Sequence, residues 1–228
     1  MQNPLGQPIG EPVNWQSASP PRRAVLAGQY CTVVPLTLAH APDLFAATQL
    51  DVDGKNWTYL FEDPITDLAA FTAWAETASQ STDPLFHAII SAQTGKAVGY
   101  ATFMRITPQM GTIEIGNIHL SPALQGRRAS TEMQYLMMKQ AFALGYRRYE
   151  WKCDSLNAPS RRAAERLGFT FEGIFRQALV YKGRNRDTAW FSVTDRDWPA
   201  LEKAFVSWLS ADNFDQSGNQ KAKLQSFR

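Results

Sequence analysis

The spacing of the apolar residues changes along this chain, and the order of these changes limits the folds that it can adopt. Three successive runs alternate apolar and polar residues as half-buried strands do, over Leu85–Ser91, Ala97–Arg105 and Thr112–Leu120. Short turns at Thr94-Gly95 and Pro108–Gly111 separate these runs. The pattern predicts an antiparallel meander in the middle of the chain.

Helical and strand-like segments alternate after the meander. Apolar residues at helical spacing predict a long helix over Gln125–Ala143, which ends before Gly145, a residue suited to a left-handed C-cap. A strand over Tyr149–Asp154 follows, and Asn157 is placed to cap a second helix that stops at Gly168. Such strand–helix–strand units place parallel strands beside each other.

The remaining segments complete an α/β pattern. Before the meander come a strand over Tyr30–Pro35, a helix over Pro42–Leu50, an extended aromatic run over Asn56–Glu62 and a helix over Thr66–Ser79. After Gly168 come two strands joined by a basic turn, Phe169–Phe175 and Thr188–Thr194, and a last helix over Asp195–Ser210. We therefore predict the α/β class, with one mixed, mostly antiparallel sheet and helices on both faces. A single domain is expected over residues 28–211.

Both ends of the chain lack an apolar period. Residues 1–27 contain five prolines and predict an extended arm, which either lies on the domain with Trp15 as an anchor or stays disordered. Residues 212–228 are polar, and we expect this tail to fray.

The composition argues against several classes of protein. A hydrophobic fraction of 44% is not that of a disordered chain, and a net charge of +2 is too small for sequence-independent nucleic-acid binding. No apolar run approaches the ~20 residues of a membrane span, and no signal peptide opens the chain. Cys31 and Cys153 belong to no metal-binding motif. We expect a cytoplasmic protein without a metal, and no membrane or nucleic-acid partner.

The start of the helix predicted at Gln125 carries features of an anion site. The first turn of a helix presents unpaired N–H groups and the positive end of its dipole. Gly126 allows close approach, Arg127 and Arg128 add charge, and Ser130 adds a hydroxyl. The pattern suits a phosphate group, although a basic helix start is also common on solvated surfaces.

The motifs around this helix start follow one another in a recognisable order. A strand leads into Gln125–Ser130, and then come the strand Tyr149–Asp154, the pair Asn157 and Ser160, and the run Glu165–Gly173 (ERLGFTFEG). Over residues 29–194 this order resembles the Gcn5-related N-acetyltransferase (GNAT) superfamily, and most of all its RimJ/RimL-like branch of ribosomal-protein N-terminal acetyltransferases. The resemblance implies the GNAT fold, acetyl-CoA as the donor, a primary amine as the acceptor and direct transfer in a ternary complex.

The resemblance also implies where the donor binds. In the family, acetyl-CoA lies where two parallel strands splay apart, which here are Thr112–Leu120 and Tyr149–Asp154. The pyrophosphate rests on the backbone of a loop that matches Gln125, Gly126, Arg127, Arg128, Ala129 and Ser130. Arg128 stands where glycine is usual, so either its side chain points outward toward the nucleotide 3′-phosphate or the loop follows a different path. The backbone of Ile118, His119 and Leu120 would hold the thioester carbonyl.

Asn157 and Ser160 lie one turn apart on a predicted helix. By resemblance, Asn157 bonds the pantetheine arm, and Ser160 donates a hydrogen bond or a proton to the departing thiolate, as a serine does in RimL-like members. The tyrosine acid of other branches would fall at Ala164. Ser160 is therefore the candidate acid.

The sequence leaves the general base open. A protonated amine cannot attack, so some group must accept its proton. Glu114 acting through water is the first candidate and His119 the second; they lie on opposite faces of their strand unless a bulge changes the phase. Glu172 matches a family glutamate in what looks like a structural turn. Leu179 occupies the position of the RimL-type base.

Two further segments are candidates for the acceptor site. Trp57, Tyr59 and Phe61 alternate, and predict either core packing or an aromatic wall beside the amine. The basic turn Lys182–Asp187 is either solvated or lies at the acceptor mouth, where it would bind a carboxylate or a phosphate. We expect the acceptor to be a small amine or a protein N-terminus. We expect the enzyme itself to be a monomer or a homodimer. The alternative is a CoA-binding module that has lost catalysis, an interpretation favoured by Arg128, by the missing tyrosine and by the missing RimL-type base.

Overall fold

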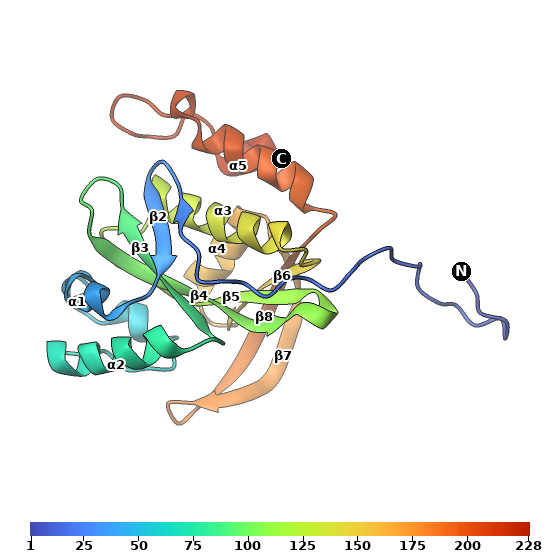
Figure 1. The fold of residues 1–228 in the computed structure, drawn as a ribbon, viewed down its shortest axis with the longest axis horizontal. Helices are drawn as coiled ribbons and strands as arrows, with labels where there is room; N and C mark the ends of the chain where they lie inside the picture. The colour runs from blue at the N-terminus through green and yellow to red at the C-terminus, as the bar shows by residue number, and fades with distance from the viewer.

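The computed structural model describes residues 1–228 and contains one sheet of eight strands (Figure 1). The strands are β1 (Leu26–Ala27), β2 (Cys31–Pro35), β3 (Leu85–Ser91), β4 (Ala97–Thr107), β5 (Thr112–Leu120), β6 (Arg148–Asp154), β7 (Thr170–Tyr181) and β8 (Arg184–Thr194). Their spatial order is β1-β2-β3-β4-β5-β6-β8-β7, and β5 and β6 are the one parallel pair. The predicted mixed, mostly antiparallel sheet is confirmed.

Five α-helices cover both faces of the sheet (Figure 1). They are α1 (Ala41–Thr48), α2 (Leu68–Gln80), α3 (Arg128–Ala143), α4 (Ala158–Leu167) and α5 (Trp198–Leu209). The first two pack around a core cluster that contains Leu44 and Phe71. The other three surround a larger cluster that contains Met137, Leu167 and Phe205. None of the helices combines the length and the apolar character that a membrane span requires.

Local signals set the ends of the helices near the site. The Asn157 side chain accepts a hydrogen bond from Ser160 N at 3.1 Å and caps α4, and Gly168, at a φ of 99°, ends that helix. Gly145, at a φ of 91°, follows α3 as predicted. However, α3 begins at Arg128 rather than at Gln125. Gly126 has a φ of 68°, so the chain turns here before the helix starts.

Strands β5 and β6 diverge toward their carboxyl ends. They pair from Thr112 with Arg148 to Ile115 with Trp151, and the pairing stops there. β5 nevertheless stays paired with β4 as far as Leu120, and β6 with β8 to its own last residue. Because each strand is held by its other neighbour, a gap opens between the two, which is the predicted splayed pair.

A bulge in β5 changes which side chains face which way. Tyr100 pairs with His119 and Thr102 with Gly116, so β5 has one residue more than β4 between these pairs. Asn117, in this stretch, has a φ of 45°, a left-handed conformation that asparagine tolerates better than most residues.

Because of the bulge, the side chains at the end of β5 face the opposite way from strict alternation. Strict alternation would put Glu114 on one face with Ile118 and Leu120. In the structure, Ile118 and Leu120 pack against the larger core cluster, to which Ile115 also belongs. His119 instead turns to the face of α1 and α2, on the same side as Glu114.

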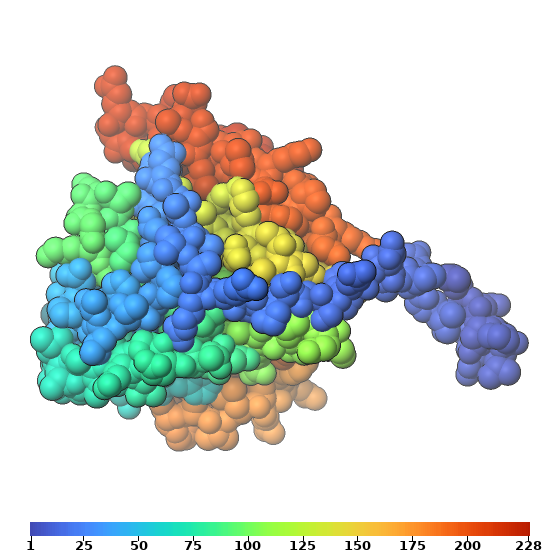
Figure 2. Space-filling view, in the orientation of Figure 1, coloured from blue at the N-terminus to red at the C-terminus, as the bar shows by residue number.

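The N-terminal residues form an extended arm that reaches the domain and runs along it to β1 (Figure 2). Trp15 Nε1 donates a hydrogen bond to Gly145 O at 2.8 Å. Ala18 N donates to Pro108 O at 3.1 Å, and Ser19 N to Leu144 O at 2.8 Å. The first residues project away from the domain (Figure 1). Of the two alternatives for residues 1–27, the structure shows an arm with Trp15 as its anchor.

The expectation that residues 212–228 fray is wrong, because this tail packs back on α4 and α5. Leu224 is fully buried, and Gln220 accepts a hydrogen bond from Trp208 Nε1 at 2.9 Å. The Asn213 side chain accepts from Ala222 N at 2.9 Å. The apolar residues of the tail are too widely spaced to form a period, so its order depends on contacts with the rest of the domain.

The extended run expected over Asn56–Glu62 does not form. Lys55–Trp57 forms a 3-10 turn after Gly54, which has a φ of 65°, and the following residues form turns and bends. The helix α2 comes next, capped by the Asp67 side chain, which accepts from Ala70 N at 2.8 Å.

Candidate active site

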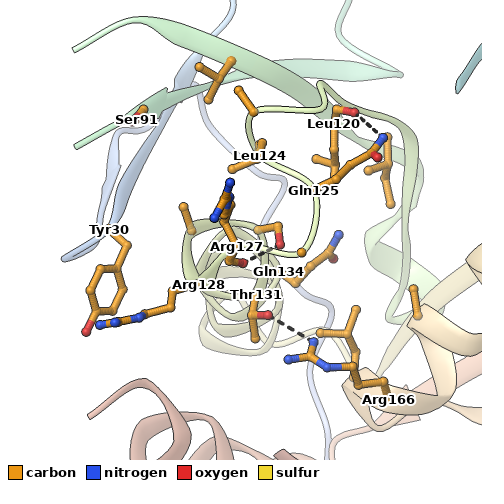
Figure 3. Close-up of a pocket in the computed structure, with 18 of the residues that line it drawn as sticks. Tyr30, Ser91, Leu120, Leu124, Gln125, Arg127, Arg128, Thr131, Gln134 and Arg166 are labelled. Atoms are coloured by element: carbon orange, nitrogen blue, oxygen red, sulfur yellow. Dashed lines mark hydrogen bonds between the residues drawn. The ribbon is translucent and has the colours of Figure 1, made fainter. Parts of the chain in front are cut away.

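A groove of about 1880 Å³ runs from the gap between β5 and β6 along the N-terminal end of α3 (Figure 3). The carboxyl end of β5, the loop before α3, one face of α4 and part of the tail line it. Ten predicted cofactor residues lie along this groove: Ile118, Leu120, Gln125, Gly126, Arg127, Arg128, Ala129, Ser130, Asn157 and Ser160. His119 alone among the predicted set does not.

The loop before α3 leaves backbone N–H groups free. Gly126 N donates no backbone hydrogen bond, and Arg128 and Ala129 open α3, where an N–H group has no helical partner. The Ser130 hydroxyl donates to Arg127 O at 2.6 Å rather than capping the helix. Free N–H groups at the positive end of a long helix suit a pyrophosphate.

Three arginines, Arg127, Arg128 and Arg166, add positive charge to the groove, and none forms an ion pair with a carboxylate. Arg128 directs its guanidinium away from the loop (Figure 3), 5.3 Å from the centre of the Tyr30 ring and 3.7 Å from that of Phe214. This residue therefore leaves the loop backbone accessible although it replaces the usual glycine.

The Gln125 side chain fastens the loop to the end of β5. Its Nε2 donates to Leu120 O at 2.9 Å and to Asn56 Oδ1 at 2.7 Å. Asn56 Nδ2 in turn donates to Leu120 O at 3.3 Å. The carbonyl of Leu120 is thus held by side chains rather than by a neighbouring strand.

Two of the three predicted carbonyl-binding residues present an N–H group to the gap. Ser121 N donates to Val98 O on β4 at 3.2 Å. Because successive residues of a strand direct their N–H groups to opposite sides, His119 N–H also faces β4, and the N–H groups of Ile118 and Leu120 face the gap.

A second cavity, of about 310 Å³, adjoins the groove at the gap. Residues of β4 to β8 and the turn at residues 59–61 line it. Six residues line both spaces: Asn56, Tyr59, Ile118, Trp151, Asn157 and Ser160. The two spaces therefore meet where the parallel strands separate.

Ser160 lies at this junction with its hydroxyl group oriented by Trp151. The indole Nε1 of Trp151 donates to Ser160 Oγ at 3.0 Å. Since the oxygen accepts this bond, the hydroxyl group keeps its proton as a donor, and the neighbouring Cys153 sulfur is within reach of that proton. Cys153 lines the second cavity, and burial raises the pKa of its thiol, which keeps it protonated and unsuited to be a nucleophile.

Glu114 lies in the second cavity, where it is the predicted general base. Its side chain is buried, and Oε2 lies 2.9 Å from Lys152 Nζ and 3.0 Å from Arg105 Nε. Oε1 accepts no hydrogen bond from the protein and is on the side of Gly116. Burial raises the pKa of Glu114 above its ordinary value, against the opposing effect of the two cations.

His119 is part of the core and not of either cavity. Its ring lies 5.3 Å from that of Tyr100 and 4.7 Å from that of Trp57, centre to centre, and only 1% of the residue is exposed. Neither ring nitrogen has a hydrogen-bond partner, and burial lowers the pKa of His119 to about 4. The structure therefore does not place His119 where a base or a cofactor ligand must be.

The three aromatic residues predicted to form an acceptor wall separate in the structure. Trp57 is buried against His119 and lines neither cavity. Tyr59 lines both spaces, and its hydroxyl donates to Leu156 O at 3.2 Å. Phe61 lines the second cavity, with its ring 5.9 Å from that of Tyr181. Two of the three thus lie at the site, brought there by a turn.

A comparison with protein families identifies the fold. The sequence profile of the acetyltransferase (GNAT) domain matches residues 31–170, more than half of the chain. The chain belongs to the GNAT acetyltransferases.

Solved structures agree with this assignment. A GCN5-related N-acetyltransferase from Brucella melitensis is 50% identical in sequence, with a TM-score of 0.92, and the match covers 94% of this chain and 98% of that one. A probable GNAT acetyltransferase from Chromobacterium violaceum is 37% identical, with a TM-score of 0.78, over 87% of this chain and 100% of that one. A search of curated proteins finds no significant match.

The likeness to the RimL branch extends to the fold alone. A RimL ribosomal-protein acetyltransferase in complex with coenzyme A is 18% identical, with a TM-score of 0.65, and covers 76% of this chain and 99% of its own. At that identity the structure supports the common GNAT fold and no particular branch.

GNAT acetyltransferases take the acetyl group from acetyl-CoA, and this chain is an acetyltransferase that uses that donor. The groove fits the cofactor, because it combines free N–H groups at Gly126 and Arg128 with three arginines that have no carboxylate partner. These residues suit the phosphates, and the gap in the sheet suits the pantetheine arm.

Sequence reasoning missed part of this GNAT groove. Arg166 lines it and donates to Thr131 Oγ1 at 3.1 Å. A signal for it existed, because Arg166 lies at helical spacing from Pro159 and Ala163, which line the same groove. Tyr30 and the tail at residues 214–220 also line it, and nothing in their sequence indicates that position.

Proposed function

We propose that this GNAT enzyme transfers acetyl from acetyl-CoA to a primary amine by direct attack within a ternary complex. The observation that carries the proposal is the meeting of two cavities at Ser160. One carries the groups expected for the phosphates of the donor, and the other holds a buried carboxylate, Glu114. A donor and an acceptor bound in these spaces would have their reactive ends at the same gap.

On the donor side, backbone groups do most of the binding. The N–H groups of Gly126 and Arg128 are assigned to the pyrophosphate, and Arg127 and Arg166 to the phosphate charge. The N–H groups of Ile118 and Leu120 face the gap, where they would stabilise negative charge on a carbonyl oxygen. When bound, acetyl-CoA supplies a thioester that an amine can attack.

Ser160 is assigned to the sulfur. Its oxygen accepts from Trp151 Nε1 at 3.0 Å, which leaves the proton to be donated toward a developing thiolate. Asn157 keeps its cap on α4 and lines both spaces, so its amide nitrogen can contact the pantetheine arm.

Glu114 is assigned to the proton of the amine, through a water molecule. Most amines are protonated at neutral pH, so attack requires a base. The raised pKa of Glu114 brings this carboxylate closer to the range in which a base works well, and Oε1 has no competing donor from the protein. Glu114→Gln should lower kcat/KM most at pH values above the pKa of Glu114, where the parent carboxylate is ionised and can accept a proton, and should leave acetyl-CoA binding nearly unchanged.

The acceptor is a small amine or the N-terminus of a polypeptide. A cavity of about 310 Å³ has room for a small molecule or for the first residue or two of a peptide. Because acetyl-CoA is a cytoplasmic metabolite, the proposal places the reaction in the cytoplasm.

The test is calorimetry with acetyl-CoA followed by a thiol-release assay over a panel of small amines and short peptides. Binding together with turnover on an amine supports the proposal. Tight binding without turnover on any amine supports a CoA-binding module that has lost catalysis. Absence of acetyl-CoA binding would refute both.

A further inference from the structure

Strand β8 presents three polar side chains to the acceptor cavity. Arg186, Thr188 and Trp190 occupy alternate positions of the strand, and all three line the second cavity. Each has a buried polar atom without a partner in the protein: Arg186 Nε, Thr188 Oγ1 and Trp190 Nε1. Buried polar groups of native proteins are nearly always paired, so three on one face of one strand call for an explanation.

Of the three side chains, Arg186 is the least favourable to leave without a partner, because it carries a charge. It is 8% exposed, and its guanidinium makes no hydrogen bond and no ion pair within the protein. The rings of Phe61 and Tyr181 lie 5.6 Å from its central carbon. These contacts hold the group in position without neutralising its charge.

The other cations of the cavity already have carboxylate partners. Lys152 pairs with Glu114 at 2.9 Å and with Glu150 at 2.7 Å, and Arg105 pairs with Glu114 at 3.0 Å. Arg186 is therefore the cation in this cavity that lacks one.

The carboxylate on the neighbouring strand does not fill this role. Asp154 lines the cavity, but its Oδ2 accepts from the Tyr181 hydroxyl at 2.8 Å and its Oδ1 from Leu156 N at 2.8 Å. A planar guanidinium with free donors is suited to bidentate binding of a carboxylate or a phosphoryl group.

We propose that the acceptor amine carries an anionic group, a carboxylate or a phosphoryl group, and that Arg186 binds it. Thr188 and Trp190 supply hydrogen-bond donors along the path from Arg186 toward the Glu114–Lys152 pair. The inference rests on the proposed function, because it assigns the second cavity to the acceptor. It makes Arg186 a specificity-determining residue that selects among amines.

The geometry also sets an order along the cavity. The four residue-to-residue steps of β8 from Arg186 to Trp190 span about 13 Å at about 3.3 Å per step. Trp190 lies beside Lys152, whose Nζ is 3.8 Å from the centre of its ring. The anionic group thus binds at one end of the acceptor site, and the amine approaches the other end, at Glu114.

The test compares matched acceptors of increasing length. Probes are ω-amino carboxylates from glycine to 12-aminododecanoate, a range that includes chains long enough to span the site, ω-aminoalkyl phosphates of similar lengths, and n-alkylamines without an anionic group. At the chain length that spans the site, kcat/KM should be at least tenfold higher for an anionic probe than for the matching alkylamine. Whether the carboxylate or the phosphate series is preferred identifies the group.

Two substitutions assign the preference to one side chain. Arg186→Met should remove it and leave the acetyl-CoA dissociation constant unchanged, which also shows that the protein is folded. Arg186→Lys should restore only part of it, because a lysine lacks the bidentate fork. Arg184→Met is the matched control: it changes the charge of the same strand equally, but Arg184 is exposed and lines neither cavity, so the preference should remain.

The possible failures are distinguishable. If alkylamines are acetylated as well as anionic probes at every length, or if Arg186→Met keeps the preference, the anion site is refuted and the acetyltransferase function stands. If no probe of any kind accepts acetyl although acetyl-CoA binds, the proposed function fails and the acceptor site fails with it.

Discussion

Removal of the Ser160 hydroxyl tests the chemistry assigned to the junction of the two cavities. Ser160→Ala deletes one oxygen atom from the first turn of α4 and keeps the helix, because alanine is the best helix former. The change leaves Trp151 Nε1 without its acceptor at 3.0 Å. Since Trp151 also lines the groove, where solvent can replace the lost partner, we expect a stability loss of about 1 kcal/mol, near the low end for an unpaired buried donor. That corresponds to a fall in Tm of about 2–4 °C.

The effect on catalysis should be larger than the effect on stability. The Ser160 oxygen accepts from Trp151, so its single proton can make one hydrogen bond to a developing thiolate. A hydrogen bond to a charged group contributes about 1.5–3 kcal/mol. At about 1.4 kcal/mol per factor of ten, kcat should fall about 10- to 100-fold. The dissociation constant of CoA should hardly change, because the negative charge on sulfur develops only during the reaction.

The assay is thiol release at saturating acetyl-CoA, with the CoA dissociation constant measured in parallel by calorimetry. Ser207→Ala, an equal change on an exposed position of α5, should alter neither quantity. If kcat for Ser160→Ala stays within twofold of the parent while CoA affinity falls, Ser160 is a cofactor anchor, and the assignment of an acid is wrong.

Further predictions concern the groove, the core and pH. Gly126→Pro removes a backbone N–H group, and proline cannot adopt the φ of 68° found at this position. The CoA dissociation constant measured by calorimetry should therefore rise at least tenfold, which is about 1.4 kcal/mol. An unchanged dissociation constant would contradict the placement of the pyrophosphate on this loop. Phe214→Ala removes the ring beneath the Arg128 guanidinium and should weaken CoA binding about two- to fivefold in the same titration, a cation–π contribution of about 0.5–1 kcal/mol. Glu132→Ala deprives three backbone N–H groups, at 2.6–2.8 Å, of their acceptor and should lower the free energy of unfolding by about 3–5 kcal/mol in urea denaturation. Burial lowers the pKa of His119 from 6.5 to about 4, so an NMR titration should show its ring neutral at pH 5.5. Because the unfolded chain takes up the proton at a higher pH than the folded protein, the free energy of unfolding should fall as the pH is lowered from 6.5 toward 4. For this residue the loss should be at most about 3 kcal/mol.

Much of the fold could be read from local patterns. The predicted bounds of β3 and β5, Leu85–Ser91 and Thr112–Leu120, agree with the structure, because turns and alternation define both strands. Asn157 caps α4, and Gly168 ends it, since capping depends on a few neighbouring residues. Part of the donor groove was equally accessible, because Ile118–Ser130 is nearly one continuous stretch and Asn157 and Ser160 lie at one helix start, whereas Tyr30 and the tail at residues 214–220 come from distant parts of the chain.

The failures have a common cause in long-range contacts. The turn at residues 55–57 depends on Gly54 and on the burial of Trp57 against His119, which lies far along the chain. A one-residue bulge at Asn117 turns the His119 side chain to the face of the sheet covered by α1 and α2. The residues around Asn117 show no pattern that predicts such a bulge. The tail, expected to fray, is ordered by contacts with α4 and α5.

The sequence by itself determined the class of the sheet, both ends of α4 and the part of the donor groove formed by Ile118–Ser130, Asn157 and Ser160, because each depends on neighbours within a few positions. The acceptor cavity was decided by the tertiary structure. Arg186 appeared in the sequence as one member of a basic turn, and only the pairing of β8 with β6 and β7 buries it beside Phe61 and Tyr181. Whether a charged side chain is solvated or left without a partner depends on what folds around it, and that information is spread over the whole chain.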